Sequence, residues 1–193
     1  RTYVAVKPVP TLAAGSGWYK GSTAESTITA IEIKDSYTPT GTVTEQWNAD
    51  VDNSGSIKAY VEGTKLTIAG NGAGKIMANA DSTSAFSYDM YAHETDPFAS
   101  VTAISGLDKL DTSNVTDMEN MFRYCVALTS LDVSSFDTSK VTSMDGMFSG
   151  CNALTSLDLS NFDTSKVTLM AAMFEGCSSL TSLDLSGWNT SKV

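Results

Sequence analysis

The C-terminal half of the chain repeats one sequence pattern with a period of 26 residues, as the spacing of Cys125, Cys151 and Cys177 shows. Each copy contains Asp-Thr-Ser, a Val, Met-x-x-Met-Phe and then the Cys. A fixed period in the twenties is typical of repeat proteins, in which each unit buries its apolar side only against its neighbours. The pattern therefore predicts a stack of similar units over residues 101–193.

The two halves of each repeat differ in periodicity. Leu157 and Leu159 alternate with polar residues, which is the pattern of a half-buried strand. From Val167 to Cys177 the apolar residues are spaced by three and four, which predicts one face of a helix. In the first repeat, Thr116 and Glu119 have the spacing of a helix capping box. We therefore expect an α/β solenoid of leucine-rich repeats, each with one strand and one short helix.

The rest of the chain predicts three segments. Residues 1–20 are expected to form an extended leader or linker, and residues 21–100 a β-rich N-terminal cap domain. The cap is predicted to contain a strand at Thr27–Ile33 and a hairpin over residues 56–69. The repeats stop at Val193, which is the position of Val167 in the preceding repeat, so a fragment truncated in mid-repeat is expected.

The consensus sequence of the repeat is specific. The sequence L-x-x-L-D-[LV]-S-x-[FW]-[DN]-T-S-[KN]-V, followed by M-x-x-M-F-x-x-C, resembles the BspA-like leucine-rich repeat surface proteins of bacteria. The resemblance covers roughly residues 101–193. It implies a recognition protein without catalytic residues, either secreted or displayed on the bacterial cell surface.

The charge balance excludes several classes of partner. The chain has 22 acidic and 12 basic residues, a formal net charge of −10. Such a chain is repelled by nucleic acids and by anionic membrane surfaces. No apolar run has the length of a membrane span, so we expect no membrane insertion of this segment.

No cofactor or metal site is predicted. The three cysteines occupy one repeat position, which favours free buried thiols over a disulfide between layers or a metal site. Asp50 and Asp52 begin a segment that resembles a calcium loop, but Val61 stands where the loop needs a bidentate Glu. A polar turn is the favoured interpretation, and calcium binding stays open. His93 has no nucleophile placed with it by any motif, so the sequence predicts no enzyme.

The repeats also predict one exposed face. If Leu131, Leu157 and Leu183 point inward, the aspartates that follow them form an outward column flanked by serines. Repeat duplication alone could have copied these aspartates. The functional hypothesis is that the column binds a protein or glycan on another cell or matrix. The alternative is a structural or receptor-binding component of an extracellular assembly, such as a phage tail or virion appendage, which self-assembles through the N-terminal region. The predicted binding residues are Ser130, Asp132, Ser134, Ser156, Asp158, Ser160, Ser182, Asp184 and Ser186.

Overall fold

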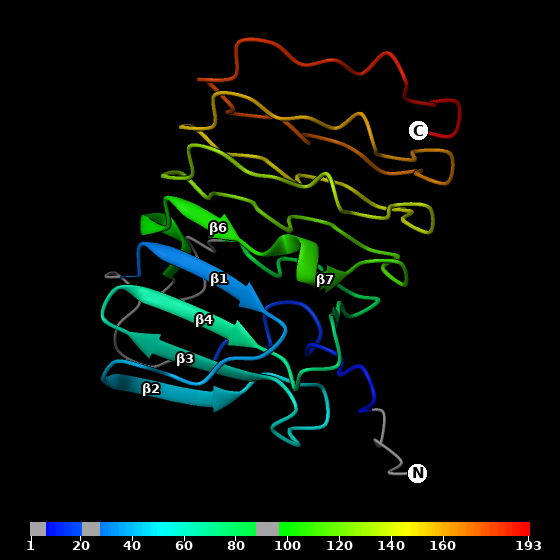
Figure 1. Cartoon of the computed structure of the whole chain (residues 1–193). Coiled ribbons are helices and arrows are strands. Elements are labelled where there is room, and N and C mark those ends of the chain that lie inside the picture. The colour runs from blue at the N-terminus through cyan, green and yellow to red at the C-terminus, as the bar shows by residue number, and fades with distance from the viewer. Residues whose placement is uncertain (1–6, 21–27, 88–96) are drawn as a thin grey trace.

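Five strands form one mixed sheet in the computed structural model, which describes residues 7–20, 28–87 and 97–193 (Figure 1). The order is β2-β3-β4-β1-β6, with β2, β3 and β4 antiparallel and β1 parallel to both β4 and β6. The predicted strand and hairpin are confirmed as β1 and as the β3–β4 pair. The strands are β1 (Ala30–Lys34), β2 (Val43–Asn48), β3 (Lys58–Glu62), β4 (Lys65–Ala69) and β6 (Ala103–Ser105).

Short elements connect this sheet to the repeats. Strand β5 (Ile76–Met77) pairs in parallel with β7 (Leu110–Asp111). Two 3-10 helices, η2 (Pro97–Ser100) and η3 (Leu107–Lys109), flank β6. Gly106 precedes η3 with φ of 77°, and a side chain there would clash with the carbonyl oxygen of Ile33. Only glycine therefore allows the repeats to approach β1 this closely.

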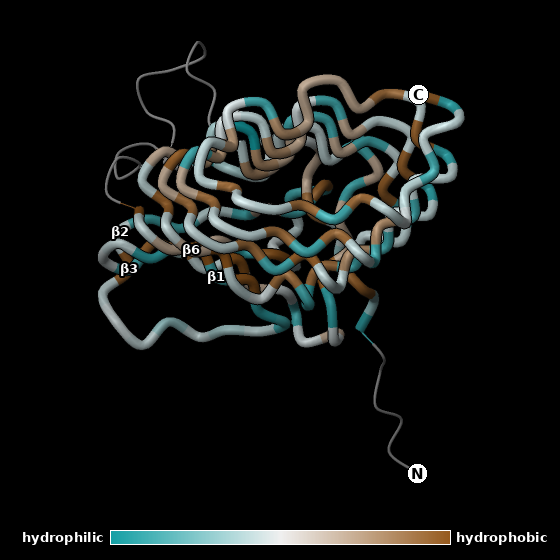
Figure 2. Tube along the Cα trace, turned by 90° about the horizontal axis from the view of Figure 1, so that it is seen from above, coloured by the Kyte–Doolittle hydropathy of each residue, from teal (hydrophilic) through white to brown (hydrophobic). Residues whose placement is uncertain are grey.

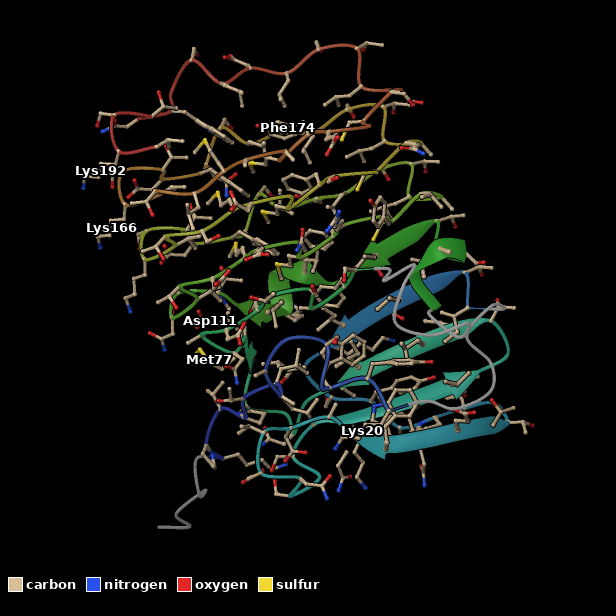
Figure 3. The ribbon with its side chains drawn as sticks, turned by 180° about the vertical axis from the view of Figure 1, so that it is seen from behind. Lys20, Met77, Asp111, Lys166, Phe174 and Lys192 are labelled. Carbon is tan, nitrogen blue, oxygen red and sulfur yellow. The ribbon has the colours of Figure 1, made fainter. Side chains whose placement is uncertain are left out.

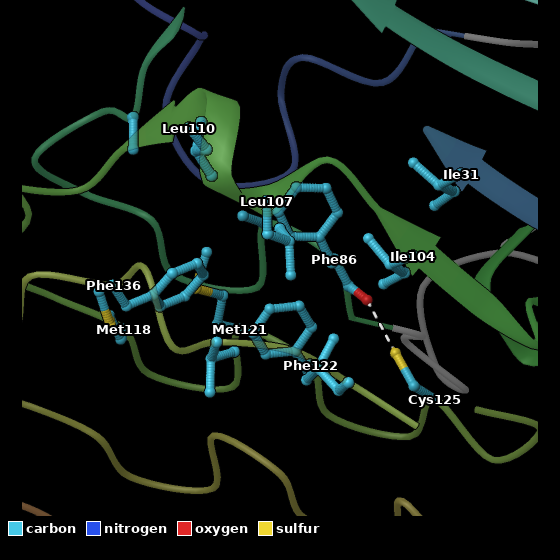
Figure 4. Close-up of a cluster of buried hydrophobic side chains, with 14 of the residues drawn as sticks. Ile31, Phe86, Ile104, Leu107, Leu110, Met118, Met121, Phe122, Cys125 and Phe136 are labelled. Carbon is cyan, nitrogen blue, oxygen red and sulfur yellow. Dashed lines mark hydrogen bonds between the residues drawn. The ribbon is translucent and has the colours of Figure 1, made fainter. Parts of the chain in front are cut away.

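A single hydrophobic core extends from Leu12 to Met173. Trp18 is fully buried, and its indole N–H donates to the carbonyl of Ala85 at 2.7 Å. Phe86 lies between the sheet and the first repeat, where its ring stacks on Phe122 with centroids 5.6 Å apart (Figure 4). The described part of the N-terminal region and the repeats therefore share one core.

The prediction of an α/β solenoid of leucine-rich repeats is wrong. No α-helix occurs in the described residues, and the regular strands form the mixed sheet and the β5–β7 pair. The predicted capping box does not cap a helix: the Thr116 hydroxyl donates to the carbonyl of Ala80, at 3.3 Å. Left-handed φ angles, such as 60° at Gly146 and 76° at Gly150, interrupt the segments that were expected to be helical.

The apolar spacing of three and four arises from tight turns. The N–H of Met121 donates to the carbonyl of Met118, and the same bond joins Cys125 to Phe122. Each such turn returns an apolar side chain to the core after three residues, so the pattern imitates a helix. The predicted strand segments keep their alternation, since Leu157 and Leu159 are buried and Asp158 is exposed, but they form no strand ladder.

Successive repeats nevertheless lie one over another (Figures 1 and 2). Their turn segments are joined by backbone hydrogen bonds, such as Phe122 N–H to the Met147 carbonyl at 2.9 Å and Phe148 N–H to the Met173 carbonyl at 3.0 Å. The rings of Phe86, Phe122, Phe148 and Phe174 form one stacked column through these layers. None of the helices in the described ranges has the length and apolar character needed to cross a membrane.

Candidate functional site

The predicted acidic column begins with a turn that the sequence itself builds. Asp132 Oδ1 accepts hydrogen bonds from the Ser134 N–H at 3.0 Å and from the Ser134 hydroxyl at 2.6 Å. Asp158 accepts the N–H of Ser160 in the same way, at 3.0 Å. In each case the aspartate carboxylate accepts the N–H of the residue two positions later, which is the hydrogen bond of an Asx turn. The carboxylates are thereby held in one orientation from repeat to repeat.

All nine predicted binding residues are exposed. The aspartates face outward because the neighbouring leucines, Leu131 and Leu157, are buried. The third member, Asp184, receives the Ser186 N–H at 2.9 Å, so the arrangement continues into the last repeat. The charge of Asp132 acts on Asp158, so these two carboxylates lie near each other in neighbouring layers.

Hydrogen bonds keep these carboxylates ionised. The hydroxyl and then the N–H of Ser134 lower the pKa of Asp132 below its ordinary value. At Asp158, the N–H and then the hydroxyl of Ser160 lower the pKa, while the charge of Asp132 acts in the opposite direction. The three aspartates are therefore anions at neutral pH, and Asp132 and Asp158 repel each other, which suits a cationic or hydrogen-bond-donating ligand.

A hollow of about 260 Å³ opens at the N-terminal end of this column. Asp132 and Ser134 line it from the repeat side, and Gly106 and Asp108 line it from the side of η3. Asp108 forms an exposed ion pair with Lys109, at 2.9 Å. Sequence reasoning did not single out Asp108, which reaches the hollow because it lies in η3 directly after Leu107.

A second column of polar residues has a structural role. The hydroxyl of Thr138 accepts from the Asp163 N–H at 2.8 Å and donates to the Asp163 carbonyl at 3.1 Å, which joins two layers. The Asp137 carboxylate accepts the Ser139 N–H at 3.0 Å. Both interactions recur at the other Asp-Thr-Ser copies, so this motif is explained by stacking. Lys166 and Lys192 lie along the same edge (Figure 3).

Among the described residues the cysteines form no disulfide with one another; Cys125 and Cys151 are buried, as expected, whereas Cys177 is partly buried. Each Sγ lies beside a carbonyl of the preceding layer, as Cys151 does at 3.2 Å from the Phe122 carbonyl oxygen. Burial, and then the neighbouring Cys177, raise the pKa of Cys151 to about 12. Because the thiolate is the reactive form, this position is unsuited to a nucleophile.

The Asp50 loop is closed by its own groups. The Asp50 carboxylate accepts the Ser54 N–H at 2.9 Å, the Ser54 hydroxyl at 2.5 Å and the Gly55 N–H at 3.2 Å. Burial alone would raise the pKa of Asp50, but these hydrogen bonds outweigh it and lower the pKa to about 2. Within the described ranges, no group of three His, Cys, Asp or Glu side chains could hold a metal ion. His93 lies outside the described residues.

The family described as "Mycoplasma protein of unknown function, DUF285" matches residues 89–193, slightly more than half of the chain. The chain belongs to this family. Its repeats, with the acidic column, fall inside the matched segment. No curated protein and no solved structure matches the chain at the significance that we required.

Proposed function

We propose that this chain is a non-catalytic recognition module of an extracellular bacterial surface, which binds a protein or glycan through its acidic column. The observation that carries the proposal is the register of Asp132, Asp158 and Asp184, three exposed carboxylates held in the same turn in successive layers. A rigid row of acceptors loses little conformational entropy when it binds a ligand. The flanking serine hydroxyls add acceptors and donors that suit a hydroxyl-rich glycan or a basic peptide.

The resemblance of the repeat to BspA-like surface proteins supports the location and the absence of catalysis. The alternative, a component of an extracellular assembly such as a phage appendage, is favoured by the sheet. Strand β2 is at one edge of the sheet, where its described residues pair with β3 alone. An edge strand can pair with a strand of another copy.

The experiment replaces the three column aspartates by asparagine. Asn189 occupies the Asp163 position of the other column and closes the same kind of turn on the Ser191 N–H at 3.0 Å, so an amide supports this geometry without a charge. The triple change Asp132→Asn, Asp158→Asn, Asp184→Asn therefore removes three charges and keeps the turns. The matched control is Asp111→Asn, Asp137→Asn, Asp163→Asn, which changes the net charge equally at the other column.

Binding is measured by biolayer interferometry against immobilised collagen, fibronectin and laminin, and against a glycan array. We expect saturable binding to at least one of these ligands. The column variant should bind at least about tenfold more weakly, since charged hydrogen bonds contribute about 1.5–3 kcal/mol each. The control variant should bind as the parent does. No binding by the parent, or equal losses in the two variants, would refute the proposal. Binding to bacterial envelopes alone would favour the appendage alternative.

A further inference from the structure

The hollow between η3 and the first repeat combines an apolar wall with two acidic rims. Ile104 and Leu107, which are 7% and 3% exposed, form part of the wall. Asp108 lines the hollow from the side of η3, and Asp132 lines it from the repeat side. The rest of the lining is Ser105, Gly106, Ser134 and Ser135. Its volume of about 260 Å³ is below the range of about 300–1,000 Å³ for drug-sized ligands, so it fits one side chain or one sugar ring.

The charges of the hollow favour a cation over a neutral sugar. The hydrogen bond from Lys109 lowers the pKa of Asp108, whereas the charge of Asp132 acts in the opposite direction and raises it. The two carboxylates are therefore close enough to repel each other. A cation that enters the hollow relieves this repulsion, and a neutral sugar does not.

The chain itself already holds an ammonium group at one rim. Lys109 Nζ lies 2.9 Å from Asp108 Oδ2, and the two side chains are 46% and 62% exposed. Because an exposed ion pair is weak, an incoming ammonium group can exchange with Lys109. A metal ion fits less well, since no group of three His, Cys, Asp or Glu side chains in the described ranges could hold one.

We propose that the hollow binds a lysine side chain, which makes the ligand of the acidic column a basic polypeptide. A lysine side chain has an apolar stem and a compact charged end. Its stem packs against the wall at Ile104 and Leu107, and its ammonium group reaches Asp108 and Asp132. The inference rests on the proposed function, because Asp132 and Ser134 belong to both the hollow and the acidic column.

The probe is tetralysine with an N-terminal fluorescein, measured by fluorescence anisotropy in about 0.15 M NaCl, where charges more than about 8 Å apart are screened. Saturable binding is expected below about 1 mM. Tetralysine acetylated at each Nζ has no ammonium groups on its side chains and should not bind. In NMR spectra, tetralysine should shift the amide resonances of Gly106 and Ser135 and leave that of Gly63, in the β3–β4 turn, unchanged.

Two neighbouring residues should change the affinity in opposite directions. Asp108→Asn removes one carboxylate and should weaken binding about two- to fivefold, the effect of one exposed ion pair. Lys109→Met removes the competing ammonium group and should strengthen binding by a similar factor. The control, Asp163→Asn, makes the same charge change as Asp108→Asn at the other column, where Asn189 supports the same turn, and should have no effect. Urea denaturation verifies that the three variants fold.

Absence of saturable binding, equal binding of the acetylated peptide, or equal losses in Asp108→Asn and Asp163→Asn would overturn the proposal. So would weaker or unchanged binding by the Lys109→Met chain. Binding to an immobilised matrix protein or glycan that the column variant loses and Asp108→Asn keeps would overturn the lysine site and leave the proposed function standing. Tetralysine binding with the expected variant effects, by a chain that binds no immobilised ligand, would support the lysine site and refute the proposed function.

Discussion

The buried threonine of the Asp-Thr-Ser motif offers the sharpest test of how the layers are joined. Thr138 is 1% exposed, and its hydroxyl makes two hydrogen bonds with the backbone of Asp163. Thr138→Val keeps the shape of the side chain and removes both bonds. With a net contribution of about 0.5–1.5 kcal/mol for each bond, the loss is about 1–3 kcal/mol. The backbone groups left without partners place it in the upper part of this range, at about 2–3 kcal/mol.

Urea denaturation measures this effect as a lower midpoint with an unchanged m value. For a chain of this size the melting temperature should fall by about 4–12 °C. Thr138→Ser keeps the hydroxyl and should cost about 0.8 kcal/mol, the value of one methyl group. The control is Thr155→Val, because Thr155 is exposed and its bond to Thr129 is long, at 3.5 Å. Equal stabilities for Thr138→Val and Thr155→Val would refute the role of the buried hydroxyl.

Three further predictions concern the backbone, the thiols and the pH dependence. In urea denaturation, Gly150→Ala should destabilise the fold by more than about 2 kcal/mol, because φ is 76° there and the new methyl group would meet the Tyr124 ring. The control Gly187→Ala, whose methyl group would meet no atom within 4 Å, should leave the unfolding free energy unchanged. In the native state at pH 8, Cys151 should react with a thiol reagent far more slowly than in urea, since its pKa of about 12 leaves about one thiolate in ten thousand; similar rates would contradict its burial. Asp50 has a folded pKa of about 2, below its ordinary 3.8, so its contribution to stability is present above pH 4 and is lost as the pH falls toward 2. Asp50→Asn should flatten the dependence of the unfolding free energy on pH in that window, and an unchanged slope would count against the hydrogen-bonded carboxylate.

The sequence predicted the repeat, its period and its buried positions, because these depend on which side chains recur. It also predicted the β3–β4 hairpin from alternation around the Gly63 turn. It failed on the backbone of the repeats because helices and successive tight turns share a spacing of three and four. The deciding signal was Gly146 and Gly150, since glycines in a short helix cost about 1 kcal/mol each.

The extent of the stack was also missed. The segment before Ser87 forms the layer beneath the first repeat, with Phe86 N–H donating to the Met121 carbonyl at 2.8 Å. Its only sequence signal is the interval of five residues from Asp81 to Phe86, which Asp117 and Phe122 repeat. The distance between Phe86 and Phe122 is 36 residues rather than 26, so a search at a fixed period passes over it. The hollow beside Asp108 lies between η3 and the first repeat, and no sequence pattern marks it.

Each aspartate of the candidate site has two separable properties: an oxygen that accepts the hydrogen bond of the turn, and a negative charge. A turn of this kind needs an oxygen acceptor two residues before the donating N–H, and Asn189 supplies one without a charge. At Asp132 and Asp158 the charge is therefore not required by the local fold, and the two carboxylates repel each other. The lowered pKa of each aspartate means that its ionised form favours the fold through the serine hydrogen bonds, while the repulsion between the two charges opposes this effect. An asparagine series that leaves stability unchanged while it weakens binding would separate the two roles in a single set of variants.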